Sequence, residues 1–415
     1  ISFLELGVGA VIQSALYKPI ANNDKDKIDE ILASGKRFFS TLALILLGYV
    51  VVLVITYPFF ISSDKSNRLS TIMLILAMSI SSFAQYYFGI VDNLLLNADQ
   101  RGYVQYSVQI VTVIVNTVVC LILIINDFSI QIVKFATSLI YLIRPFAIRI
   151  YVNHHYTINR KKRYKNEPLP QKWSGVAQHV ASVVLDGTDN IVLTTCSSLT
   201  NVSIYSAYHN VVYGVKNLLI SATNGFQSAL GECIAKEDKE STLFLFELTE
   251  TIIHISTVFL FTCVGILILP FMKVYTDGVV DANYIQPLFS VLLVLAHALN
   301  CLRLPYHITI KAAGKYKETQ KCYIIAAVLN IVISIAGVFI WGLIGVAIGT
   351  LIAMLYQTIW MVYFDSKNII NISVKKFWKR CAIDVLLAVV IIGATFWIKM
   401  KSISYLSWFI MACEV

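Results

Sequence analysis

The sequence predicts an all-α, polytopic membrane protein built as a two-lobe helical bundle, and three observations lead to this fold class. Hydrophobic residues make up 57% of the 415 residues, and charged residues only 14%. Apolar runs long enough to cross a bilayer, roughly 20 residues each, recur along the chain. Residues 13–25 recur without a gap at residues 227–239, with eight of thirteen positions identical. Such a composition could not present a polar surface to water, so a membrane is the expected solvent.

Each long apolar run is predicted to be a membrane-spanning helix. A backbone exposed to lipid has to satisfy its own hydrogen bonds, and the runs lack the alternation of barrel strands. The runs lie at residues 3–17, 38–60, 71–96, 104–125, 130–151, 174–198, 203–231, 244–270, 284–310, 321–340, 342–363 and 381–398. A further run at 403–412 ends close to the C-terminus, where we expect a truncated helix.

The repeat predicts how these helices are organised. The offset of 214 residues also aligns Asn116 with Asn330 and Arg101 with Lys315. Long internal repeats in an apolar chain are typical of transporters with two related lobes. An even number of helices per repeat would give both six-helix repeats the same orientation in the membrane.

The same alignment predicts the boundaries of the lobes. The span at 174–198 has its counterpart before Ile1, so we expect the first helix of the N-terminal lobe to be missing. The segments are then an N-terminal lobe at 1–152, a basic interlobe loop at 153–172, a C-terminal lobe at 173–363 and an additional C-terminal helix pair at 364–415.

The distribution of basic residues predicts the topology. Alternate connecting segments hold 24 Lys and Arg residues, and the segments between them hold five. By the positive-inside rule the basic set is cytoplasmic, including loops 18–37, 149–172, 311–321 and 364–380. This explains the net charge of +9, so the basic run at 160–163 gives no reason to expect nucleic-acid binding.

Four basic residues fall inside predicted spans: Lys134, Arg144, Lys216 and Arg303. A charge at the centre of a bilayer costs at least roughly 2.5–3.5 kcal/mol on insertion scales. Lys134 lies near a helix end, where snorkelling explains it. Arg144, beside Pro145, either lines the entrance of a cavity or snorkels to the cytoplasmic face.

Lys216 belongs to a polar seam deep in its span. The pairs His209-Asn210, Lys216-Asn217 and Thr223-Asn224 recur every seven residues, and Tyr213 is near the same face. A spacing of seven keeps side chains within about 20° of one stripe. The seam either lines a hydrophilic cavity that presents a cation to an anionic substrate, or it forms interhelical hydrogen bonds.

Arg303 is the second candidate for a cavity cation. His297 and Asn300 precede it at helical spacings, and Pro305 is expected to break or kink the helix. Irregular backbone at membrane depth is tolerated beside a cavity or inside protein. The alternative is that Arg303 snorkels toward the cytoplasm.

Several acidic residues also lie within the predicted spans. Asp186 and Asp189 are three residues apart, so they share a helix face and either hold a coupling cation or proton or act as counterions of Lys216. Asp92 is a further intramembrane acid. Glu247 and Glu250 are expected in the first turns of a helix, where the helix dipole favours carboxylates.

Motifs for covalent chemistry are missing from the sequence. The eight cysteines form no CxxC pair, and we expect them to be packing residues and not metal ligands. The sequence has no Walker A loop, Rossmann glycine pattern or zincin motif. We therefore propose no catalytic residue, no enzymatic activity and no bound cofactor.

Several segments together resemble polysaccharide-export proteins of the oligosaccharide flippase type, within the multidrug/oligosaccharidyl-lipid/polysaccharide exporter superfamily. The resemblance covers nearly the whole chain, and its motifs are diagnostic only in combination. They are Glu5-Leu6-Gly7-Val8-Gly9-Ala10, residues Asp186 to Asn190, Val202-Ser203-Ile204-Tyr205, Arg303-Leu304-Pro305-Tyr306 and Ala312-Ala313-Gly314.

The resemblance implies a two-lobe flippase of a bacterial plasma membrane. Its substrate would be a polyprenyl-pyrophosphate-linked oligosaccharide used to assemble a capsule, O-antigen or teichoic-acid-like polymer, with membrane lipids and polysaccharide polymerase machinery as partners. Such flippases carry cavity cations, and Lys216 matches that pattern. The alternative is a cation-coupled multidrug exporter of the same superfamily, which Asp186 and Asp189 would suit. Coupling to Na⁺, H⁺ or the membrane potential stays open.

Overall fold

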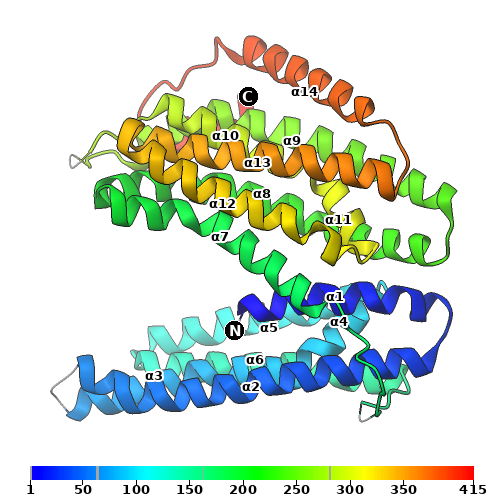
Figure 1. The fold of residues 1–415 in the computed structure, drawn as a ribbon. Helices are drawn as coiled ribbons and strands as arrows, with labels where there is room; N and C mark the ends of the chain where they lie inside the picture. The colour runs from blue at the N-terminus through cyan, green and yellow to red at the C-terminus, as the bar shows by residue number, and fades with distance from the viewer. Residues whose placement is uncertain (1, 62–64, 161, 280–281) are drawn as a thin grey trace. The chain divides into compact units, whose positions relative to one another are not determined.

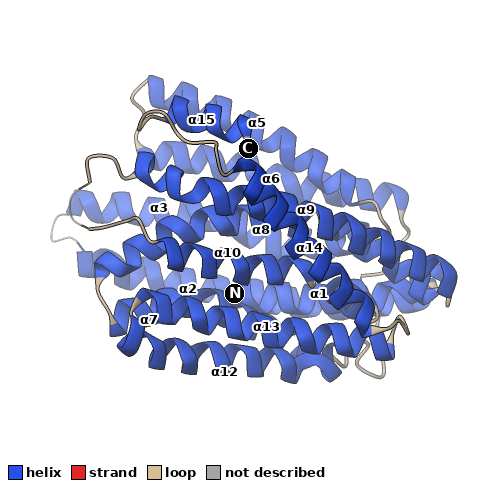
Figure 2. Cartoon of the chain, turned by 90° about the horizontal axis from the view of Figure 1, so that it is seen from above, coloured by secondary structure: helices blue, strands red, loops and turns tan. Residues whose placement is uncertain are grey.

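The structure is a computed structural model that describes residues 2–61, 65–160, 162–279 and 282–415. No strand occurs within these ranges, and helices joined by short loops account for the architecture (Figures 1 and 2). The chain divides into two compact units, Ile1–Val176 and Ala177–Val415. The all-α fold class predicted from composition is therefore confirmed.

The N-terminal unit contains six helices, a π-helical insertion and the first residues of a seventh helix. They are α1 (Ser2–Ala21), α2 (Lys25–Ile61), α3 (Lys65–Ala84), the π-helix η1 (Gln85–Gly89), α4 (Ile90–Ala98), α5 (Gly102–Ile125), α6 (Ile130–His155) and the start of α7 (Lys172–Cys196).

The C-terminal unit contains the rest of α7 and eight further helices. They are α8 (Leu199–Ala235), α9 (Lys239–Tyr275), α10 (Pro287–Leu302), α11 (Leu304–Ala312), α12 (Tyr316–Trp341), α13 (Leu343–Asn368), α14 (Val374–Thr395) and α15 (Tyr405–Glu414).

Helix boundaries in the two units follow the repeat found in the sequence. α8 and α11 end 214 positions after the ends of α1 and α4. α9 and α12 begin 214 positions after the starts of α2 and α5. The four pairs are Ala21 and Ala235, Ala98 and Ala312, Lys25 and Lys239, and Gly102 and Tyr316.

Both units interrupt the corresponding helix at the same position of the repeat. In the N-terminal unit the π-helix η1 ends at Gly89, and in the C-terminal unit α10 and α11 are separated at Arg303, 214 residues later. Gly89 allows α6 to approach closely, since a Cβ there would lie 2.9 Å from the Cβ of Pro145. The C-terminal break falls two residues before Pro305, as the proline predicts.

Close helix contacts depend on glycine in the C-terminal unit. α12 and α13 form an antiparallel hairpin whose turn residue, Gly342, has a φ of +57°. A Cβ on Gly345 would lie 2.1 Å from the carbonyl oxygen of Gly337, so only glycine allows this approach. The core beside it is aromatic and aliphatic, with Tyr205, Tyr208 and Phe289 nearly fully buried.

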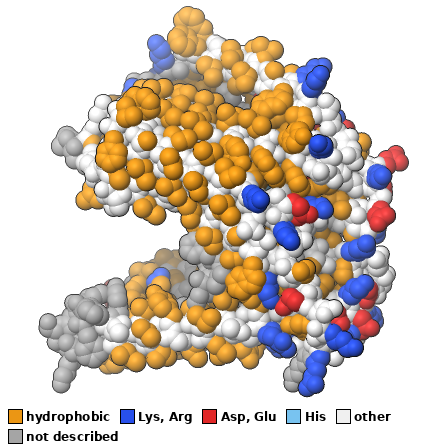
Figure 3. Space-filling model, in the orientation of Figure 1, with side chains coloured by type: hydrophobic (Ala, Val, Ile, Leu, Met, Phe, Trp, Pro, Cys, Tyr) orange, Lys and Arg blue, Asp and Glu red, His pale blue; other side chains and the backbone are white. Residues whose placement is uncertain are grey.

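Membrane-compatible surfaces cover both units. Eight helical segments of the described chain are long and apolar enough to cross a membrane. Figure 3 shows hydrophobic side chains spread over the visible face of the C-terminal unit. The predicted spans in α1, α7, α8 and α14 also form helices. These four helices are not among the eight apolar segments. In α7 and α8, polar and charged residues within the span lower the mean hydropathy.

The predicted interlobe loop packs onto the N-terminal unit. Lys162 forms an ion pair with Asp26, and the backbone N–H of Asn159 donates to the Asp29 carboxylate at 3.0 Å. Further along, the Glu167 carboxylate accepts from the Ser34 hydroxyl of α2 at 2.6 Å. The described parts of this loop are therefore held against α2 of the same unit.

Candidate functional site

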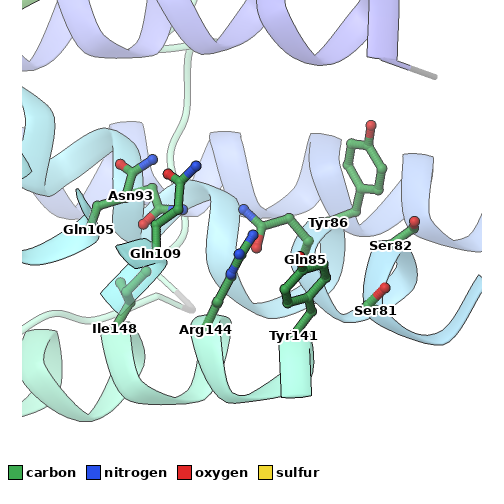
Figure 4. A pocket seen from close by; sticks show the side chains of 10 residues that line it. All are labelled: Ser81, Ser82, Gln85, Tyr86, Asn93, Gln105, Gln109, Tyr141, Arg144 and Ile148. Carbon is green, nitrogen blue, oxygen red and sulfur yellow. The ribbon is translucent and has the colours of Figure 1, made fainter. Parts of the chain in front are cut away.

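A polar pocket of about 300 Å³ opens within the N-terminal unit, at the level where α3 passes into η1 (Figure 4). This volume is at the lower end of the range of small-molecule sites. Its walls come from α3, η1, α4, α5 and α6. The lining residues are Ser81, Ser82, Gln85, Tyr86, Asn93, Gln105, Gln109, Tyr141, Arg144 and Ile148.

Arg144 is the charged residue of this pocket. It extends from α6 beside Tyr141 toward Gln85 (Figure 4). Its Nε donates to the Thr112 hydroxyl of α5 at 2.7 Å, and its guanidinium carbon lies 3.9 Å from the centre of the Tyr141 ring. These contacts hold the guanidinium in place, while four of its five N–H donors are not used by the Thr112 bond.

The remaining lining groups are mainly amides and hydroxyls. Among the described residues that line the pocket none is acidic, so the guanidinium is not neutralised from within the wall. The buried Oδ1 atom of Asn93 has no hydrogen-bond partner among the residues that the structure describes. Such a wall can bind an anion at Arg144 and hydroxyl groups at the amides.

In the C-terminal unit, Lys216 forms an ion pair with Asp186. The Lys216 ammonium lies 2.9 Å from Asp186 Oδ1, and the exposed fractions of the two side chains are 3% and 35%. Lys216 also lies 4.7 Å from the centre of the Tyr213 ring. Lys216 is thus neutralised by a carboxylate whose other side is accessible, and it does not stand as a free cation.

Aromatic rings extend from this ion pair along α8. His209 stacks between Tyr205 and Tyr213, with 5.2 Å between ring centres on each side. His297 of α10 meets His209 edge to face at 5.6 Å. His297 is buried, and neither of its ring nitrogens has a hydrogen-bond partner in the described chain.

The polar seam of α8 divides between two faces, which corrects the single stripe expected from the sequence. Lys216 and Thr223 are buried, whereas Asn210, Asn217 and Asn224 are exposed. Adjacent helical residues point about 100° apart, and packing decides which residue of each pair turns inward. Three exposed amides at membrane depth are better suited to water than to lipid.

Asp189 is bound inside the C-terminal unit, away from the Lys216 ammonium. Its carboxylate accepts from Tyr205 at 2.9 Å, from Thr350 at 2.6 Å and from Asn330 at 3.4 Å. It is nearly fully buried. Although Asp186 and Asp189 share a helix, the first faces Lys216 and the second connects α7 to α8, α12 and α13.

The residues around the break between α10 and α11 are packed inside the unit. Arg303 is 7% exposed, and its Nη1 lies 3.5 Å from the sulfur of Met361. Its Nε has no hydrogen-bond partner within the described part of the chain. Asn300 donates to the sulfur of Met354 at 3.1 Å. Burial of the Arg303 guanidinium argues against snorkelling toward the cytoplasm.

Asp92 of α4 forms an ion pair inside the N-terminal unit. Its Oδ1 lies 2.9 Å from Nη2 of Arg160, which comes from the loop after α6. The structure therefore gives Asp92 a counterion within its own unit.

Sequence reasoning missed most of the N-terminal pocket. Only Arg144 was identified, because a charge in an apolar span is conspicuous. The available signal was a set of amides in spans of the N-terminal half: Gln85, and Gln105 with Gln109 one turn apart. Their convergence on Arg144 depends on helix packing, which the sequence does not disclose.

Comparison with solved structures places this architecture among transporters of the MATE fold. The Vibrio cholerae MATE transporter VcmN, in a mutant form, superposes with a TM-score of 0.72 at 11% identity, covering 90% of this chain and 86% of that protein. An outward-facing multidrug resistance MATE family transporter of the MOP superfamily gives a TM-score of 0.64 at 15% identity, covering 91% and 85%.

A third similar structure is a MOP superfamily transporter from Pyrococcus furiosus. Its binding pocket is described as having reverse polarity that suggests a different function. The TM-score is 0.61 at 14% identity, covering 88% of this chain and 84% of that protein. No protein-family model and no curated protein sequence matches the chain. At these identities the likeness establishes the fold.

Proposed function

We propose that this chain is a membrane transporter that works by alternating access. Its fold is that of MATE transporters, and each unit carries polar groups at membrane depth. Transport would consist of one unit moving against the other around a site near the middle of the membrane. No covalent bond changes in such a cycle, which fits the lack of catalytic motifs in the sequence.

The substrate class we propose is a polyprenyl-pyrophosphate-linked oligosaccharide, translocated across a bacterial plasma membrane. The observation that carries this proposal is the pocket around Arg144, with one cation, no described acidic lining residue and a wall of amides and hydroxyls. A pyrophosphate would bind the guanidinium, whose attraction for anions is stronger in a low-dielectric site than in water. Amides and hydroxyls suit the sugars.

A cation-coupled multidrug exporter is the second candidate. Two observations favour it: the similar structures include proteins named as multidrug transporters, and Asp186 offers a partly exposed carboxylate. By names alone the fold comparison favours drug export over the flippase. The pocket around Arg144 is the reason to place the anionic substrate first, because an uncompensated guanidinium repels cationic drugs.

One experiment separates the two candidates. A strain lacking the protein is complemented with wild type, Arg144→Gln or Lys134→Gln, the last removing an exposed charge from the same helix. We expect Arg144→Gln to lower surface-glycan export roughly tenfold to a hundredfold, the loss of a charged hydrogen bond, and Lys134→Gln to leave it unchanged. Drug susceptibility that rises without any glycan defect would instead establish the multidrug exporter.

A further inference from the structure

A second cavity system lies in the N-terminal unit, apart from the polar pocket. An apolar groove of about 350 Å³ is formed by α2, α3, η1 and α6, with almost no polar wall. Among its lining residues are Leu47, Leu76, Phe83, Phe88 and Phe146. From Leu76 to Phe88 it follows twelve residues, or about 18 Å of helix.

Basic side chains surround the end of this groove. Lys36 of α2, Arg149 of α6 and Arg160 line a small adjoining pocket together with Asp92 and Phe88. Phe88 thus belongs to both cavities. Its ring lies 5.5 Å from the ring of Phe146 in the groove and 5.7 Å from the guanidinium carbon of Arg149.

Basic residues outnumber acidic residues among the groups that line this small pocket. Asp92 is the acidic residue that lines the small pocket, and it is 2% exposed and bound by Arg160. Three cations against one carboxylate leave a positive balance on the lining groups. Under the positive-inside topology this end faces the cytoplasm, where anionic headgroups lie.

We propose that the N-terminal unit binds one anionic phospholipid of the cytoplasmic leaflet, with an acyl chain in the groove and its phosphate at Lys36 and Arg149. An apolar groove at membrane depth accepts a chain of any lipid, and the basic cluster adds selectivity for a negative headgroup. The charge complementarity decides the occupant. This proposal does not rest on the transported substrate, because it involves neither Arg144 nor the C-terminal unit.

The position of the site suggests what the lipid does. Phe88 belongs to the π-helix η1, whose residues Gln85 and Tyr86 line the polar pocket. π-helical segments are rare and are frequent at functional sites. A bound chain would cover Phe88 and thereby support the segment that also shapes the polar pocket.

Native mass spectrometry of the purified full chain tests the proposal. The protein is mixed with equal amounts of phosphatidylglycerol and phosphatidylcholine, and retained lipid is counted. We expect wild type to prefer phosphatidylglycerol by roughly thirtyfold, from two basic residues near the headgroup. The double variant Lys36→Gln/Arg149→Gln should lose this preference, and Arg149→Lys with native Lys36 should keep most of it.

Control variants make the result decisive. Lys375→Gln/Lys379→Gln removes the same charge from exposed positions of α14, and an equal loss of preference there would overturn the proposal. Ser79→Phe fills the groove and should abolish retention of the selected lipid. Polyprenyl phosphate outcompeting phosphatidylglycerol, or glycerol 3-phosphate binding as tightly as the whole lipid, would also overturn it. Circular dichroism and the melting temperature verify folding of each variant.

Discussion

At the scale of single residues, the ion pair between Lys216 and Asp186 allows a role in stability to be separated from a role in transport. We expect Lys216→Met to lower the free energy of unfolding by about 1–3 kcal/mol, less than for a fully buried pair because Asp186 is partly exposed. The double variant Lys216→Met/Asp186→Leu should recover most of that loss, since no uncompensated charge remains. Thermal unfolding in detergent measures both effects.

Transport by the same double variant separates the two interpretations of Lys216. If the ammonium serves the transport cycle, the variant will be stable but inactive. If Lys216 only holds α8 and α7 together, the double variant will stay active. Turnover at the wild-type rate by a stable double variant would therefore remove Lys216 from the functional site.

Glu167 gives a pH dependence to the loop between α6 and α7. Partial burial raises the pKa of Glu167, but hydrogen bonds from Lys172, Ser34 and the Leu169 amide outweigh it, and the net shift lowers the pKa. A lowered pKa means that the folded state favours the carboxylate. The stabilisation is therefore fully present above the unfolded pKa of about 4.3, and it is lost as the pH falls through the lower pKa of the folded state.

Hydrogen exchange of the loop measures this dependence. After correction for intrinsic rates, the amides near Leu169 should lose protection between pH 6 and pH 3.5. In Glu167→Gln the protection should be low at both values, whereas Glu237→Gln in an exposed turn should behave as wild type. Protection that is independent of pH in the wild type would contradict the assignment.

At the scale of elements, three polar contacts one turn apart attach α14 to α9. Lys376 lies 2.5 Å from Glu247, Arg380 lies 2.7 Å from Glu250, and Asp384 lies 2.6 Å from His254. The expected placement of Glu247 and Glu250 in the first turns of a helix is wrong, because α9 begins at Lys239. Their carboxylates serve as docking sites for α14.

Removal of the central contact should loosen α14. Glu250 is fully buried, and Tyr306 also donates to it at 2.5 Å. We expect Arg380→Ala to destabilise the attachment by about 2 kcal/mol, because a buried carboxylate loses its counterion. The loss is smaller than for a fully buried pair, since the Arg380 side chain is partly exposed. Limited proteolysis of the loop before α14 should accelerate accordingly. The loop of Lys379→Ala, which changes an exposed neighbour, should be cleaved at the wild-type rate. Equal cleavage rates for the two variants would refute the role of the contact.

Some elements could be predicted from the sequence, and others depend on packing. The segment at 13–25 and its copy gave the repeat, and helix boundaries such as Ala21 and Ala235 follow it. The π-helix η1 could not be predicted, because it accompanies the contact of Gly89 with Pro145 on a distant helix. Likewise, spacing placed Lys216 on a polar face, but only packing against α7 selected Asp186 as its partner.

At the scale of the whole molecule, α7 is a continuous helix that passes from one unit to the other. The division falls between Val176 and Ala177. Just before it, a Cβ on Gly175 would lie 2.5 Å from the carbonyl oxygen of Gly7 in α1. Just after it, the Gln178 side chain donates to the Tyr316 carbonyl at 2.6 Å. Alternating access through motion of the units would therefore be transmitted through this helix.

Loosening the junction should impair transport more than stability. Glycine in a helix interior costs about 1 kcal/mol relative to alanine, and Val176→Gly/Ala177→Gly adds that flexibility at the division between the units. We expect the turnover in proteoliposomes to fall several-fold, while Val183→Gly/Val184→Gly, farther along the same helix, keeps turnover near wild type. Both double variants should show similar decreases in unfolding temperature, since each places two glycines in α7. Full turnover by the junction variant would mean that a rigid α7 is not needed, and that any motion between the units is guided by contacts elsewhere.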